Sequence, residues 1–532
     1  MKNYYLRSAF IAFVLMTFAG GINSQSVTIL QKQVPVLTLI DGNPITLIKL
    51  DTGKENTIVS SVSLDLTGTT DLDDLESIKV FYRGDNLQDS IQFGKTHAPS
   101  KRLAVKGHTN LMSGSGYFSI IVKLKDEAEL LNSLVVRCTG IKAGDKTLIP
   151  ANDYRPLRLR FGTALCQHWE DGVHTYRIPA IARTNNGTLL AIFDRRLEAH
   201  RDPQGVANIG LKRSTDGGRT WEPQQVIMDR GDWGGLPPRY NGVTDACILV
   251  NEKNNEIFVG ALWMHGQWID GKWVGIPDDP DAELGRKKAS MPGMTEKETC
   301  QLLMVRSSDD GQTWSEPENL TRIKKPEWPL YALSPTNGIT LQDGTLVFPS
   351  KIPGNVALTY SKDGGQTWAV SNLGPKTNGA ENVIVQLDDG SVMLNARSMG
   401  RSDYRTVYTT PDLGKTWIEH PTNNKILQEP GCHGSLYKHV YKQNGEKKCI
   451  LFFSNPNSAR KRERMTIKAS FDEGKTWPEK YWILLDEERG AYSSITSVDD
   501  DTIGILYEGS QAHMTFQKIS IAEFINKSAL GI

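Results

Sequence analysis

Short apolar runs alternate with turn residues along most of this chain. The runs at residues 176–183, 188–194 and 207–213 are rich in Ile, Leu and Ala, and Asn185-Asn-Gly187 supplies a tight turn between the first two. Runs of this kind, bounded by Gly, Asn and Asp, predict β-strands joined by hairpins. The same grouping of three strands recurs, for example over residues 381–409. The pattern therefore predicts an all-β protein built from repeated antiparallel units.

An eight-residue motif, Ser/Thr-x-Asp-x-Gly-x-Thr-Trp, follows the third strand of most of these groups. It occurs five times, at residues 214–221, 307–314, 361–368, 410–417 and 470–477. The Asp can accept hydrogen bonds from nearby backbone N–H groups, the Gly can adopt a positive φ, and the Trp can pack between sheets. The requirements of a tight turn thus account for every invariant residue of the motif. The motif, called the Asp box below, indicates architecture rather than catalysis.

The strands and Asp boxes together predict a six-bladed β-propeller, since the box spacing is typical of propeller blades. Five groups of strands end in a box, and a sixth group at residues 492–520 has none. A long loop, about residues 266–298, lengthens the second unit. Residues 25–155 lack boxes but are also rich in strand-like runs, which predicts a smaller β-sandwich domain before the propeller at residues 156–532.

The N-terminus has the layout of a secretory signal peptide. Lys2 and Arg7 precede an apolar run at residues 9–18, and small or polar residues follow it up to residue 24. The run is too short to span a bilayer, and no later stretch approaches that length. We expect residues 1–24 to be removed, and the mature protein to be a monomer without a membrane span, exported to the periplasm or the cell exterior.

The composition narrows the classes of function. In 532 residues, 61 Lys and Arg balance 61 Asp and Glu, and this zero net charge argues against nucleic-acid binding. Six scattered cysteines include no CxxC pair, which argues against a disulfide scaffold and against a zinc site. We therefore expect no metal, no other cofactor and no nucleic-acid partner.

Propeller topology sorts the polar residues onto two rims. Because the strands of a blade are antiparallel, the start of the first strand, the end of the second and the start of the third face one rim, the near rim. The Asp boxes line the opposite, far rim. The near rim receives Tyr176, Arg177, Asp194, Arg195, Arg196, Asp245, Glu381, Arg397, Arg462, Tyr492 and Glu508. An arginine fork suits a carboxylate, so the near rim is the predicted ligand site.

Several motifs, in order, give the chain a specific resemblance. They are Tyr176-Arg-Ile-Pro179, Asp194-Arg-Arg196, Leu394-Asn-Ala-Arg-Ser398, Asn455-Pro before Arg462, Gly490-Ala-Tyr492-Ser and Leu506-Tyr-Glu508. Together with the boxes, they resemble the bacterial exo-sialidases of glycoside hydrolase family thirty-three, over about residues 165–510. The resemblance implies a secreted exo-α-sialidase that releases terminal sialic acids from glycans with net retention.

The resemblance also implies how the substrate is bound. Arg177, Arg397 and Arg462 would hold its carboxylate. Glu508 would hold Arg177 in place, while Arg196 and Asp245 would contact the substituents of the sugar ring. Three arginines lie close together at residues 460, 462 and 464, and Arg462 is chosen for its spacing to Met465 and Thr466.

The catalytic residues implied are Tyr492 as nucleophile, Glu381 as its base and Asp202 as the acid/base. Sialic acid carries a carboxylate at its anomeric carbon, which would repel a carboxylate nucleophile. Tyrosine avoids this repulsion, and sialidases are the tyrosine exception among glycosidases. Because a free phenol has a pKa near ~10, Tyr492 needs a base to take its proton.

Other readings stay open at the level of sequence. A non-catalytic sialoglycan-binding propeller would not need the Tyr492–Glu381 pair, and an Asp-box glycosidase of another kind would not need the arginines. The sequence also does not distinguish hydrolysis from transfer, so a trans-sialidase or an intramolecular trans-sialidase stays an alternative. The N-terminal domain is either a glycan-binding module or a packing domain for the propeller.

Overall fold

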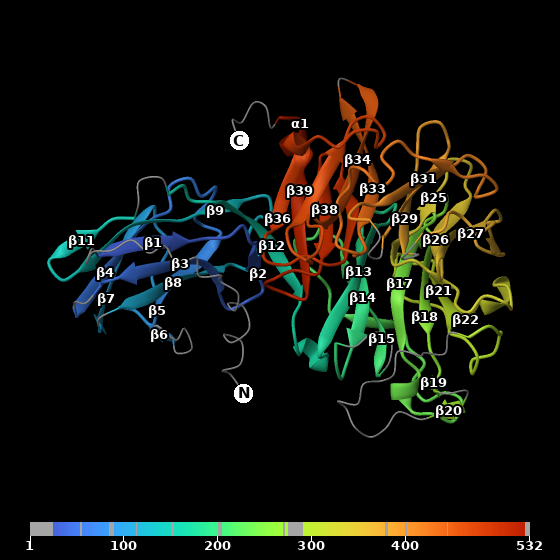
Figure 1. Ribbon diagram of the computed structural model, residues 1–532, viewed down its shortest axis with the longest axis horizontal. Helices are drawn as coiled ribbons and strands as arrows, with labels where there is room; N and C mark the ends of the chain where they lie inside the picture. Colours follow the sequence, from blue (N-terminus) through green and yellow to red (C-terminus); the bar gives the residue numbers. More distant parts are fainter. Residues whose placement is uncertain are drawn as a thin grey trace. The chain divides into compact units, whose positions relative to one another are not determined.

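A computed structural model describes residues 25–53, 56–84, 90–112, 114–150, 154–200, 205–269, 272–274, 291–377, 381–398, 402–443 and 445–526. The predicted signal peptide, the predicted acid/base Asp202 and part of the predicted loop at residues 266–298 lie outside these ranges. The chain forms two compact units, Met1–Ala164 and Leu165–Ile532. The division falls within strand β12 (Arg158–Cys166), later than the boundary predicted near residue 155 (Figure 1).

Two antiparallel sheets build the N-terminal unit. In spatial order, the first contains β1 (Ser26–Leu30), β3 (Asn43–Asp51), β8 (Ser115–Leu124), β5 (Leu75–Arg83) and β6 (Ser90–Gln92). The second contains β11 (Lys146–Leu148), β10 (Arg137–Ala143), β4 (Thr57–Asp65) and β7 (Arg102–Leu111). Two short strands, β2 (Val36–Thr38) and β9 (Ser133–Val135), pair with β12. Alternating buried positions, as in β4, place one face of each strand in a core.

The second unit is a succession of mainly antiparallel sheets in chain order. The first sheet contains β13 (Thr175–Arg183), β14 (Leu189–Arg196), β15 (Ala207–Ser214) and β16 (Gln225–Met228). The next contains β17 (Val243–Val250), β18 (Ile257–Trp263), β21 (Gln301–Ser307), β22 (Glu318–Asn319) and β24 (Thr336–Asn337). It is followed by β23 (Ala332–Leu333), β25 (Ile339–Thr340), β26 (Leu346–Ile352), β27 (Asn355–Ser361) and β28 (Ala369–Val370).

The next two sheets each contain four strands that neighbour one another in chain order. One contains β29 (Asn382–Gln386), β30 (Val392–Ala396), β31 (Thr406–Thr410) and β32 (Ile418–Glu419). The next contains β33 (Ser435–Gln443), β34 (Glu446–Pro456), β35 (Met465–Ser470) and β36 (Trp482–Asp486). Strands β37 (Ser493–Asp499), β38 (Thr502–Tyr507) and β39 (Met514–Ser520) follow, and then helix α1 (Ala522–Ile525). The predicted loop at residues 266–298 contains a hairpin of β19 (Gln267–Ile269) and β20 (Lys272–Val274).

Neighbouring sheets of this unit pack face to face. One apolar cluster joins Ile192 of β14 to Ile248 of β17, and corresponding clusters join each following pair of sheets. The backbone N–H of Ile181 in β13 donates to Ser494 Oγ in β37 over 3.0 Å, so the last strands also contact the first. Strand β14 is buried on both faces, which explains why it reads as a continuous apolar run. This cyclic packing is that of a propeller-type domain.

The strand registers place the Asp boxes away from the near rim. In the first sheet Thr175 pairs with Arg196 and Arg196 with Ala207, whereas the opposite ends pair Leu189 with Ser214. Ser214 begins the first box, and the other boxes likewise follow their third strand. In that first box Asp216 accepts hydrogen bonds from Ser214 Oγ at 2.9 Å and from the Thr220 N–H at 2.9 Å. The same Ser/Thr–Asp–Thr pattern recurs in each of the other four boxes. In each box the Asp thus finds hydrogen-bond donors within the box itself.

Candidate active site

The central residues of the near rim stand where strand pairs of the second unit end. Glu381 directly precedes β29 and Arg397 directly follows β30. The Arg397 N–H donates to the Glu381 carbonyl at 2.8 Å, so the hairpin ladder runs one step beyond the strands. Tyr492 and Glu508 flank β37 and β38 in the same way, and the Glu508 N–H donates to the Tyr492 carbonyl at 3.0 Å. Regular sheet geometry therefore fixes the backbone that carries these side chains.

Tyr492, Glu381 and Arg397 form one hydrogen-bonded cluster. The Tyr492 hydroxyl donates to the Glu381 carboxylate, with oxygen–oxygen distances of 2.9 and 2.8 Å. Arg397 Nη1 donates to Glu381 Oε2 at 2.6 Å and to Tyr492 Oη at 2.9 Å. A phenol that shares a proton with a carboxylate beside a guanidinium is arranged to release that proton.

The pKa values of the pair are displaced in opposite directions. Burial, together with the Glu381 charge, raises the pKa of Tyr492 well above its usual value. Burial also acts to raise the pKa of Glu381, but the charges of Arg397 and Lys351 outweigh it and lower this pKa to about 2. At rest the proton therefore stays on the phenol, and Glu381 is an ionised acceptor next to it.

Three guanidinium groups surround the Tyr492 ring. Arg177 Cζ lies 5.6 Å and Arg462 Cζ 5.7 Å from the ring centroid, while Arg397 contacts the hydroxyl. Glu508 holds Arg177 by accepting from its Nε at 3.2 Å and Nη2 at 3.4 Å. The buried Nε of Arg397 has no hydrogen-bond partner among the described residues. This cluster of positive charge over a tyrosine can bind an anionic group.

Of the three neighbouring arginines, Arg462 is the one that faces the site. Its Nη2 donates to the Gly431 carbonyl at 3.5 Å, and its guanidinium lies over Tyr492. Arg460 instead pairs with Asp403 at 3.5 Å, and Arg464 lies 3.9 Å from Glu487. The structure therefore brings Arg462, rather than Arg460 or Arg464, to Tyr492.

Arg196 and Asp245 lie on the same rim and share one partner, Asp194. The buried Asp194 carboxylate accepts from Arg196 Nη2 at 2.8 Å and from the Asp245 N–H at 2.9 Å. Asp245 has a positive φ of 60°, at a break in the register between β17 and β18. Asp194 thus holds a strained backbone position that directs Asp245.

Two further residues of this cluster were not assigned a role from the sequence. Lys351 Nζ, in β26, donates to Asp245 Oδ2 at 2.7 Å and lies 3.9 Å from Glu381 Oε1. His433 Nδ1 lies 3.9 Å from Glu381 Oε2, and burial lowers the pKa of His433 to about 3. Lys351 is the last residue but one of β26, the second strand in the order of its sheet, so the rim rule could have found it. His433 lies between strands and carries no comparable signal.

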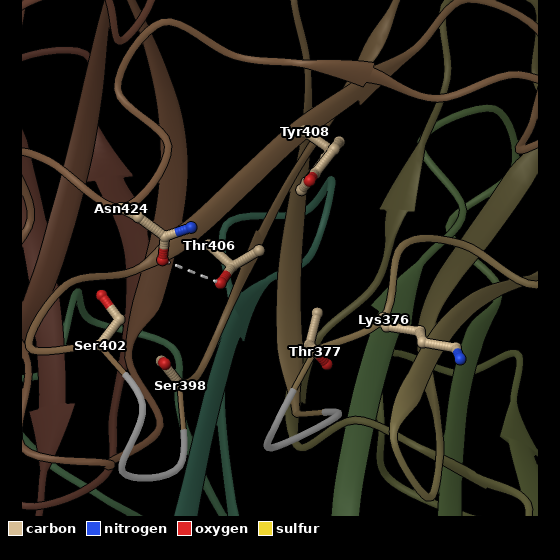
Figure 2. A pocket seen from close by; sticks show the side chains of 7 residues that line it. All are labelled: Lys376, Thr377, Ser398, Ser402, Thr406, Tyr408 and Asn424. Carbon is tan, nitrogen blue, oxygen red and sulfur yellow. Dashed lines mark hydrogen bonds between the residues drawn. The ribbon is translucent and has the colours of Figure 1, made fainter.

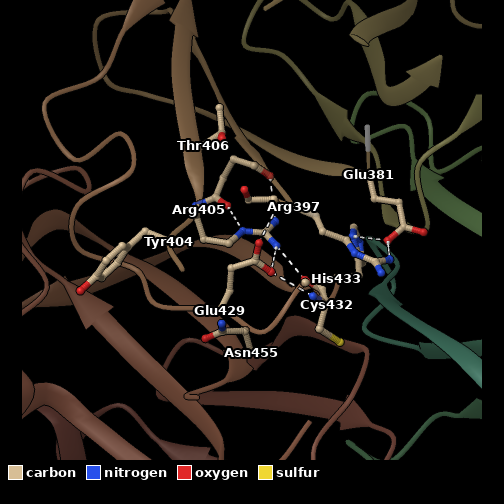
Figure 3. A network of polar contacts seen from close by, with 12 residues as sticks. Glu381, Arg397, Tyr404, Arg405, Thr406, Glu429, Cys432, His433 and Asn455 are labelled. Atoms are coloured by element: carbon tan, nitrogen blue, oxygen red, sulfur yellow. Dashed lines mark hydrogen bonds and ion pairs between the residues drawn. The ribbon is translucent and has the colours of Figure 1, made fainter. Parts of the chain in front are cut away.

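A second layer of polar contacts fixes the backbone around Arg397 and His433 (Figure 3). The buried carboxylate of Glu429 accepts from the N–H of Ser398, which follows Arg397, and from the N–H of Cys432 at 2.9 Å. Arg405 lies 3.5 Å from Glu429 and donates to the Cys432 carbonyl at 2.8 Å. Because these groups are fully buried and mutually paired, they can hold two chain segments of the site in place.

A polar hollow lies beside Ser398 (Figure 2), with a volume of about 320 Å³. Its lining residues are Lys376, Thr377, Ser398, Ser402, Thr406, Tyr408 and Asn424. Within it, Thr406 Oγ1 donates to Asn424 Oδ1 at 3.4 Å. Hydroxyl, amide and ammonium groups of this kind can exchange hydrogen bonds with sugar hydroxyls.

The described part of the chain offers neither a cluster of metal ligands nor a membrane-spanning helix. Across those ranges, no group of three or more His, Cys, Asp or Glu side chains is placed to hold a metal ion. No helix within them has the length and hydropathy to cross a membrane.

The chain matches two known domain families and is similar to known proteins along most of its length. Residues 187–507 match a BNR repeat-like domain, and residues 24–147 match the N-terminal domain of BNR-repeat neuraminidase. A sialidase of Bacteroides fragilis is 35% identical over 98% of this chain and 100% of its own length. A sialidase of Paraclostridium sordellii is 29% identical over 63% of this chain and 81% of its own.

A solved structure extends the likeness to the fold of both units. The Hadza microbial sialidase Hz136 has a TM-score of 0.85 and 33% identity, covering 93% of this chain and 100% of that one. The N-terminal domain and the BNR repeats occur together here, as the matched domains do in neuraminidases. The chain therefore belongs to the sialidases, a family of glycoside hydrolases.

Proposed function

We propose that this sialidase is an exo-α-sialidase that releases terminal sialic acids from glycoconjugates with net retention, through a tyrosyl-enzyme intermediate. The observation that carries the proposal is the hydrogen bond from Tyr492 to Glu381 beneath three guanidinium groups. An anionic sugar would be bound by its carboxylate directly above a protonated tyrosine and an ionised base.

Substrate binding divides between two groups of residues. Arg177, Arg397 and Arg462 receive the carboxylate, because planar guanidinium groups form parallel N–H bonds to carboxylate oxygens. Arg196 and Asp245 face the ring substituents. Glu508 contributes indirectly, since its carboxylate orients Arg177.

Two carboxyl groups exchange protons during the reaction: Glu381 with the tyrosine nucleophile, and Asp202 with the leaving group and the attacking water. Tyr492 Oη attacks the anomeric carbon while Glu381 accepts its proton, and Asp202 protonates the departing glycosidic oxygen. Water then attacks the same carbon, with Asp202 as base, and Tyr492 leaves with the proton that Glu381 returns. Two inversions at one carbon give net retention.

A fluorogenic α-sialoside tests the activity most directly. Turnover, with the α-anomer as the first product by NMR, supports the proposal, whereas binding without turnover would indicate a sialoglycan-binding propeller. Product analysis separates hydrolysis from transfer and from intramolecular trans-sialidase chemistry, because those reactions yield a new sialoside or an anhydro sugar.

Export belongs to the same proposal. The charged start, short apolar run and small residues of positions 1–24 support cleavage near Gln25 and a destination in the periplasm or outside the cell. N-terminal sequencing of the mature protein tests this, and a mature chain that begins at Met1 would contradict it.

A further inference from the structure

Lys351 is the one charged residue of β26, a strand of buried residues. All seven positions of β26 (Leu346–Ile352) are buried, and the side chain of Lys351 is 11% exposed. A buried ammonium is unfavourable unless it is paired. Two carboxylates provide that pairing, Asp245 at 2.7 Å and Glu381 at 3.9 Å, and they come from two different sheets. Lys351 therefore connects two parts of the proposed site.

The groups that face Glu381 divide between its two oxygens. Arg397 donates to Oε2, and His433 Nδ1 lies 3.9 Å from the same atom. Lys351 faces Oε1, and the Tyr492 hydroxyl lies within 2.9 Å of both oxygens. Because its pKa is lowered, His433 is neutral. Its Nε2–H donates to the Pro335 carbonyl at 3.0 Å. Lys351 is thus the second cation beside this carboxylate, after Arg397.

We propose that Lys351 is a positioning residue of the sialidase reaction, which holds the Asp245 carboxylate toward the sugar and keeps a second positive charge against Glu381. The proposal rests on the roles assigned above to Tyr492 and Glu381. Lys351 acts through these two carboxylates and does not itself contact the reacting atoms.

The positive charge of Lys351 affects the reaction most at the step in which the tyrosyl-enzyme intermediate breaks down. Glu381 then carries the proton taken from Tyr492 and returns it to Tyr492 Oη as the bond between that oxygen and the anomeric carbon breaks. A cation beside Glu381 makes its protonated form a stronger acid, which favours this return. The same cation keeps Glu381 ionised in the free enzyme as the pH falls. Asp245 keeps Lys351 charged, since the two carboxylates raise the pKa of Lys351 against the effect of burial.

Lys351→Met removes the charge and retains most of the side-chain volume. We expect the acid limb of the kcat/KM profile to move to higher pH by about one to three units, as for loss of an opposite charge at this distance. We also expect reactivation of the enzyme inactivated by a 2,3-difluorinated sialic acid to slow by about tenfold or more. Lys351→Arg should restore both properties in part, and Lys351→Gln offers a second neutral variant if the methionine variant does not fold.

Lys212→Met is the matched control. Lys212 is also a buried lysine, in β15, and its Nζ donates to the Leu165 carbonyl at 2.6 Å and to Glu170 at 3.0 Å. Its loss should lower stability but leave the pH profile and the reactivation rate unchanged. If the Lys351 variants match this control in both measurements, the proposal for Lys351 is wrong. If the unmodified enzyme forms no adduct on Tyr492, the proposed function itself fails.

Discussion

The two rims of the propeller-type unit use acidic residues in opposite ways. At the far rim each box Asp accepts hydrogen bonds from residues within four positions of itself, as Asp363 does from Ser361 and Thr367. At the near rim Glu508 binds Arg177, 331 residues away, and Glu381 accepts from Tyr492, 111 residues away. At the far rim the hydrogen bonds of the box Asp residues are thus local and recur from box to box. The near rim is assembled once, from segments that lie far apart in the sequence.

The two environments lower carboxylate pKa values for different reasons. Hydrogen bonds from the Thr367 side chain and N–H lower the pKa of Asp363 to about 2. Glu381 reaches a similar value against the effect of burial, through Arg397 and Lys351. A change at the far rim should therefore alter stability, and a change at the near rim should alter catalysis. Repeated residues identify the architecture, and the residues that break the repeat identify the site.

Arg397→Lys should give the largest loss of activity. An ammonium cannot supply two parallel N–H bonds to a carboxylate, and Arg397 also contacts both Glu381 and Tyr492. We expect kcat/KM to fall about 30-fold or more, equivalent to about 2 kcal/mol, with a native circular dichroism spectrum. Near-normal kcat/KM would remove Arg397 from the proposed carboxylate site.

Arg462→Ala should lower kcat/KM by about tenfold, the loss of one charge-assisted hydrogen bond to substrate. Arg460→Ala is the matched control, because Arg460 pairs with Asp403 rather than facing Tyr492. Steady-state kinetics of both variants measure the difference. A larger loss in the Arg460 variant would show that the assignment belongs to the neighbouring arginine.

Asp363→Ala should have the smallest effect on activity. We expect Tm to fall by about 2 °C, because the box loses its hydrogen-bond acceptor, while kcat/KM per folded molecule stays unchanged. The pKa of Asp363 is lowered from 3.8 to about 2 on folding, so its stabilisation is present above about pH 4 and is lost as the pH falls toward 2. Thermal unfolding of the variant and the parent should converge over that range. Loss of activity at unchanged Tm would contradict the separation of the rims.

The sequence predicts the far rim better than the near rim for a physical reason. Asp boxes and hairpins depend on contacts between residues a few positions apart, so the local sequence alone predicts their structure. The near-rim set of Arg177, Arg397 and Glu508 could be predicted because strand direction decides which end of each strand meets the site. The position of Lys351 near the end of its strand follows from the same rule, but its pairing with Asp245 and Glu381 does not, because these partners come from other sheets.

In the proposed reaction the near rim acts through Tyr492 as the nucleophile. A 2,3-difluorinated sialic acid should form a slowly hydrolysed adduct, and trypsin should release it on the peptide of residues 490–518, which follows Arg489 and ends at Lys518. Fragmentation in the mass spectrometer should place the sugar on Tyr492 rather than on Tyr507, and Tyr492→Phe should form no adduct while it still binds sialic acid. An adduct on any other residue, or none in an enzyme that turns over the sialoside, would contradict the account.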